Sequence, residues 1–155
     1  MKMYRIALIS ILLLAISCQT AYIPPECITP DYKDFQLEWG YDDGNLEYIS
    51  GYILDESGYI RSFRQSRESK VRDMDTVRRI DGTVVCYLLS KMNTEVARMP
   101  MINEPGKRLT FIMLTKPAVD MRIRIVWNEY STYASKGYRA LFDTLMSVVK
   151  NKKEK

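Results

Sequence analysis

The side chains of this protein that could do chemistry are carboxylates, lysines, tyrosines and three cysteines, because the sequence contains no histidine. Without an imidazole, Ser-His-Asp and Cys-His nucleophilic sites are excluded, and the usual zinc ligands are incomplete. The run Ser147-Val-Val-Lys150 has the S-x-x-K spacing of a serine nucleophile, but its partner motifs S-D-N and K-T-G do not occur. These patterns predict no catalytic residue and no cofactor, so an enzyme is the function they favour least.

The acidic stretch YDDGNLEY is the one place where the sequence suggests a metal ion. In a calcium loop of the EF-hand type beginning at Asp42, the twelfth position must be a bidentate glutamate, and here it is Ile53. A different calcium loop could use Asp42, Asp43 and Asn45. A tight turn between two strands favours the same residues, and we therefore predict a turn and no metal site.

Tyrosine is abundant, with eleven in the chain, and the tyrosines gather in 41–59 and 130–138. Tyrosine is enriched at protein interfaces, but it also covers sheet edges while its hydroxyl stays in water. If the first and last strands point the same way, the loops that follow them emerge together. We then predict that Tyr41, Tyr130 and Tyr133 form a binding surface, the alternative being two solvated connections.

The N-terminus reads MKMYRIALISILLLAISCQT, in which Lys2 and Arg5 precede an apolar run. The run from Ile6 to Ile16 is shorter than the ~18–20 residues that a membrane-spanning helix needs. Its length, its charged start and the small residues that follow it are typical of a secretory signal peptide. We predict that residues 1–17 are this signal.

The cysteine that ends this segment indicates a particular class of signal peptide. The sequence Ala15-Ile16-Ser17-Cys18 resembles a bacterial lipobox. The resemblance implies that Cys18 is acylated, that residues 1–17 are removed, and that the mature chain is held on a membrane by its lipid. The alternatives are an ordinary signal peptide with an unmodified Cys18, or, less in keeping with the length, an uncleaved membrane helix.

The chain that remains after the signal has the length of one domain, and its basic and acidic residues nearly balance. The net charge of the whole chain is +4, and removal of residues 1–17 leaves 21 basic and 19 acidic residues. This balance argues against nucleic acid as a partner. Residues 18–33 contain three prolines and are predicted to be a tether, followed by a single domain at 34–150 and a basic tail at 151–155.

The two cysteines beyond Cys18 leave a choice open. In an exported protein Cys27 and Cys86 could form a disulfide bond. Cys86 lies in the apolar run TVVCYLL, so it could equally be a buried free thiol. Sequence alone does not place the two Cα atoms at bonding distance.

The elements that position these residues follow from hydrophobic periodicity. Strands are predicted at 35–39, 46–54, 59–63, 109–115 and 121–127, a loop at 66–75, and helices at 83–96 and near the C-terminus. The fold class is α+β: an antiparallel sheet of about four to five strands with two helices on one face, in the order ββαββα with an additional early strand. Alternation in the runs FQLEW and MRIRIVW predicts that Trp39 and Trp127 are core residues. In the second run, Arg122, Arg124 and Val126 fall on the opposite face.

The segments FQLEWGYDDGNLEYISGYILDESGYI, EPGKRLTFIML and RIVWNEY, followed by a terminal helix, resemble a group of small bacterial lipoproteins. The order of the predicted strands and helices in this chain is also similar to that of emfourin-type inhibitors of thermolysin-like proteases. In those inhibitors a Gly-Gly-Phe turn joins the first two strands, and here Asp43-Gly44-Asn45-Leu46 takes its place. The resemblance implies an envelope protein that binds another envelope protein or a protease, or else a structural accessory without a ligand.

Overall fold

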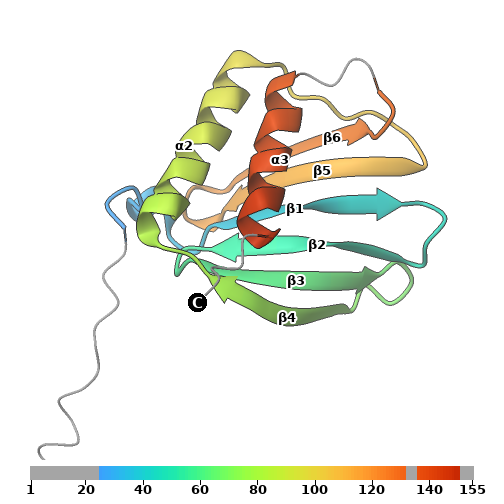
Figure 1. Ribbon diagram of the computed structural model, residues 1–155, viewed down its shortest axis with the longest axis horizontal. Coiled ribbons are helices and arrows are strands. Elements are labelled where there is room, and N and C mark those ends of the chain that lie inside the picture. Colours follow the sequence, from blue (N-terminus) through green and yellow to red (C-terminus); the bar gives the residue numbers. More distant parts are fainter. Residues whose placement is uncertain (1–24, 132–135, 151–155) are drawn as a thin grey trace, which may run out of the picture.

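Six antiparallel strands form one sheet in the computed structural model, which describes residues 25–131 and 136–150 (Figure 1). The strands are β1 (Gln36–Asp43), β2 (Tyr48–Asp55), β3 (Tyr59–Ser66), β4 (Arg72–Arg79), β5 (Arg108–Lys116) and β6 (Met121–Asn128). The helices are α2 (Gly82–Arg98) and α3 (Lys136–Lys150), with short 3-10 turns η1 (Pro30–Tyr32) and η2 (Pro117–Val119). The strand order is β4-β3-β2-β1-β5-β6.

The predicted sheet of four to five strands in the order ββαββα is wrong, because the described residues form six strands in the order ββββαββα. The missed element is β4, part of which was predicted to be a loop. Its side chains are mostly exposed and charged, so it has no apolar periodicity. β4 is held by backbone pairing with β3 along one edge of the sheet, where charged side chains discourage pairing with other chains.

Both helices lie on one face of the sheet and bury one apolar stripe each (Figure 1). The side chain of Asp81 caps the start of α2 by accepting a hydrogen bond from the backbone N–H of Thr83 at 2.8 Å. The residues that α2 and α3 bury recur every three or four positions: Val85, Leu88, Leu89, Met92, Tyr138, Leu141, Phe142 and Leu145. Periodicity therefore predicted the helices correctly.

The two tryptophans lie in the core between the helices and the sheet, which confirms the prediction from alternation. Trp39 and Trp127 are 0% and 2% exposed. The ring of Trp127 meets the ring of Phe142 edge to face, with centroids 5.8 Å apart. The last strand and the last helix are thus joined through one aromatic contact.

Cys27 and Cys86 form a disulfide bond that ties the segment before β1 to α2. Their Cα atoms are 5.5 Å apart. Nearby, the side-chain amide of Asn93 on α2 donates a hydrogen bond to the hydroxyl of Tyr32 at 2.7 Å. Cys27 and Tyr32 also pack against the main core. Part of the segment that was predicted as a tether therefore lies against the domain.

Candidate binding surface

The loops after β1 and β6 emerge at the same end of the sheet. Both strands pair with β5 in the antiparallel sense, so they run in the same direction (Figure 1). Asp43 at the end of β1 faces Arg108 at the start of β5, and Leu109 faces Asn128 at the end of β6. The geometric condition on which the predicted tyrosine surface depends is therefore met.

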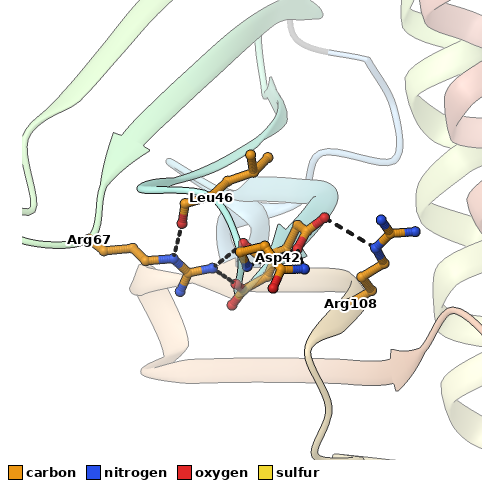
Figure 2. A network of polar contacts seen from close by, with 6 residues as sticks. Asp42, Leu46, Arg67 and Arg108 are labelled. Carbon is orange, nitrogen blue, oxygen red and sulfur yellow. Dashed lines mark hydrogen bonds and ion pairs between the residues drawn. The ribbon is translucent and has the colours of Figure 1, made fainter.

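The β1–β2 turn is held from one side by Arg67, which lies just after β3 (Figure 2). The guanidinium of Arg67 donates hydrogen bonds to the backbone oxygens of Leu46 at 2.9 Å and Asp43 at 3.0 Å. It also forms an ion pair with Asp42. Inside the turn, the carboxylate of Asp43 accepts a hydrogen bond from the backbone N–H of Asn45 at 2.9 Å. These contacts fix a turn whose residues would otherwise be solvated and mobile.

Arg108 approaches the turn from the other side (Figure 2), and it also contacts the loop after β6. Its Nε lies 3.3 Å from a carboxylate oxygen of Asp43, and its Nη1 donates a hydrogen bond to the hydroxyl of Tyr130 at 2.9 Å. The hydrogen bond that Arg108 donates to Tyr130 and the charge of Asp43 both raise the pKa of Arg108. One side chain on β5 thus connects the two loops that the sequence singled out.

Tyr41 is the aromatic residue at the centre of this end of the sheet. Its ring meets Phe142 of α3 edge to face at 5.3 Å, and 44% of the residue remains exposed. Burial of the hydroxyl raises the pKa of Tyr41, and the negative charges of Glu129 and Asp143 raise it further. The phenol therefore stays protonated at neutral pH and can donate a hydrogen bond to a partner.

Two shallow recesses flank these side chains. One of about 270 Å³ lies among Tyr41, Leu46 and Arg108, and another of about 300 Å³ lies beside Tyr130. Leu46 and Tyr130 are 43% and 70% exposed. We call the group that surrounds the first recess, together with Tyr130, the end surface: Tyr41, Asp43, Leu46, Arg108, Glu129 and Tyr130.

The structure brings some predicted site residues together and leaves others undescribed. Tyr41 and Tyr130 both belong to the end surface. Tyr133 and the lipidation candidate Cys18 lie outside the described residues. Sequence reasoning missed Arg67 and Arg108, whose importance depends on strand pairing that no local pattern encodes.

The carboxylates of the β1–β2 turn are engaged by arginines. Asp42 pairs with Arg67 and Asp43 with Arg108. In residues 25–131 and 136–150, no three Cys, Asp or Glu side chains are grouped so that they could hold a metal ion. The calcium alternative for the stretch YDDGNLEY therefore gains no support from the geometry.

No protein-family model matches the chain, and no curated protein matches it either. Among the described residues, no helix combines the length and the apolar character needed to span a membrane.

Proposed function

We propose that this protein is a lipid-anchored bacterial envelope protein that binds another envelope protein through the end surface. The observation that carries the proposal is the bridge from Asp43 through Arg108 to Tyr130, which unites two loops on one rigid sheet. Loops held by a rigid scaffold are where small domains usually bind. Exposed aromatic side chains with few torsions contribute contact area at low entropic cost.

Inhibition of a protease is one form that this binding could take. In emfourin-type inhibitors, a Gly-Gly-Phe turn joins the first two strands. In this chain the first and last residues of that turn, Asp43 and Leu46, belong to the end surface. The runner-up is a structural or assembly accessory that has no ligand, and an enzyme is third.

Membrane anchoring predicts one processed and lipidated N-terminus. Mass spectrometry of the protein extracted from membranes should show an acylated peptide that begins at Cys18, because the lipobox-like sequence directs cleavage before it. Cys18→Ala should abolish this processing and release the protein from the membrane fraction, since two or more acyl chains hold a protein on a bilayer. An unmodified mature N-terminus at another residue would contradict the lipoprotein assignment.

Partner binding should depend on the tyrosines of the loop after β6. Full-length protein used as bait in solubilised envelopes should capture a specific partner protein. The double variant Tyr130→Ala, Tyr133→Ala should capture much less of that partner. Tyr87→Ala is the matched control, because Tyr87 is an exposed tyrosine on α2, away from the end surface. Equal capture by all three proteins, with folding intact by circular dichroism, would place the binding surface elsewhere.

A further inference from the structure

The face of the sheet opposite the helices has an apolar centre that neither α2 nor α3 covers. Ile53, Phe63, Phe111 and Val126 form a second apolar cluster there, and each is at most 8% exposed. Both helices lie on the other side of the sheet (Figure 1). We call this second side the open face.

The sheet bends toward the open face and makes it a trough. Arg72 on β4 and Glu38 on β1 are three strands apart in the sheet, yet their side chains form an ion pair at 3.1 Å. In a flat sheet these strands would lie ~14 Å apart. Gly40 and Gly51 face each other on β1 and β2, where a Cβ would lie 2.2 or 2.3 Å from a backbone oxygen. This close approach of two strands at paired glycines accompanies the bend.

One wall of the trough is electrically balanced. Arg72 pairs with Glu38, which is 5% exposed, and donates a hydrogen bond to the side-chain oxygen of Gln65 at 2.8 Å. Its guanidinium carbon also lies 4.3 Å from the centroid of the Phe63 ring. The positive charge of Arg72 is therefore neutralised by Glu38, whose buried carboxylate needs such a partner.

The other wall carries two arginines without a carboxylate partner. Arg122 and Arg124 lie two residues apart on β6 and so point to the same face. Nε of Arg122 lies 3.1 Å from the sulfur of Met113, and Nη1 of Arg124 lies 3.3 Å from the side-chain oxygen of Asn103. Within the described part of the chain, neither guanidinium forms an ion pair.

Between the two walls lies a cavity of about 180 Å³, which is open to solvent beside the exposed Arg122 and Arg124. It is also lined by Arg72, Glu38, Phe63, Phe111 and Met113. Asp42 also lines the cavity, but its charge is paired with Arg67. The excess charge in the cavity is therefore positive and belongs to Arg122 and Arg124. Beneath them lie the apolar side chains of Phe63, Phe111 and Met113, each at most 8% exposed.

We propose that this cavity binds a small organic carboxylate with an apolar body. The planar guanidinium groups of Arg122 and Arg124 match the two oxygens of a carboxylate, and such charge-assisted hydrogen bonds are strong. The aromatic and thioether floor would cover a short aliphatic or aromatic group. The volume limits the ligand to a small carboxylate. This site is separate from the end surface and does not depend on the function proposed for it.

Titration calorimetry with benzoate and hexanoate on the full-length protein, in a non-ionic detergent, tests this assignment. Both carboxylates should bind the wild-type protein in the millimolar range or more tightly. Arg122→Gln combined with Arg124→Gln should weaken binding about ten- to a hundred-fold, the effect of losing hydrogen bonds to a charged group. Each single variant should show a smaller loss.

The control variant is Arg64→Gln, because Arg64 is an exposed arginine on β3 whose position in the strand pairing places it on the helix-covered face. It should bind both carboxylates as the wild type does. Benzyl alcohol and inorganic phosphate, which lack the charge or the apolar body, should bind more weakly than benzoate. The proposal is overturned if neither carboxylate binds, if the folded double variant binds them unchanged, or if phosphate binds as tightly as benzoate.

Discussion

Trp127→Ala should lower the free energy of unfolding by about 3–5 kcal/mol, the range measured for large-to-small changes in packed cores. The ring is 2% exposed and is held between the sheet and Phe142 of α3. Its removal leaves a cavity that neither β6 nor α3 can fill without moving. Urea unfolding followed by circular dichroism measures the loss, because the variant also removes a fluorophore.

The matched control for this prediction is Tyr87→Ala, which truncates an aromatic ring that is 55% exposed. Surface changes of this kind usually alter stability by less than about 0.5 kcal/mol. A loss below about 1 kcal/mol for Trp127→Ala would mean that the ring contributes little to the core. Such a result would contradict the packing of Trp127 between the sheet and α3.

Removal of the disulfide by Cys27→Ala and Cys86→Ala should cost about 4 kcal/mol. The bond joins residues 59 positions apart, and closing a loop of that length removes much entropy from the unfolded chain. A reducing agent should lower the melting temperature of the wild-type protein and leave that of the double variant unchanged. Both measurements are best made on the same full-length preparation.

Thiol titration gives an independent test of the same bond. In the folded protein without reductant, Cys27 and Cys86 should not react, whereas after denaturation and reduction both should. Two reactive thiols in the oxidised native protein would contradict the pairing. The segment before β1 would then be attached to α2 by packing and hydrogen bonds alone, such as the one between Asn93 and Tyr32.

The sequence predicted the parts of the fold whose burial repeats along the chain. Alternation located the strands that contain Trp39 and Trp127, and the spacing of three and four residues located both helices. β4 lacked this signal because an edge strand buries little. Its pairing with β3 also shifts register between Ile60 and Arg61, which blurs any simple alternation.

The candidate sites were predictable only in part, for a related reason. The composition of the loops drew attention to Tyr41 and Tyr130, and alternation placed Arg122 and Arg124 on one face. The contacts that bring these residues together into candidate sites are made between different strands. The bridge of Arg108 between two loops depends on the order of the strands in the sheet, which hydrophobic periodicity does not determine.

Site-specific photo-crosslinking in intact cells tests most directly whether the end surface is where this protein binds. A p-benzoylphenylalanine side chain in place of Tyr130 would lie at the most exposed aromatic position of the end surface. The same side chain in place of Tyr87, on α2, is the control. We predict a discrete crosslinked protein from position 130 and none from position 87. Crosslinks from position 87 alone, or from neither position, would contradict binding through the end surface.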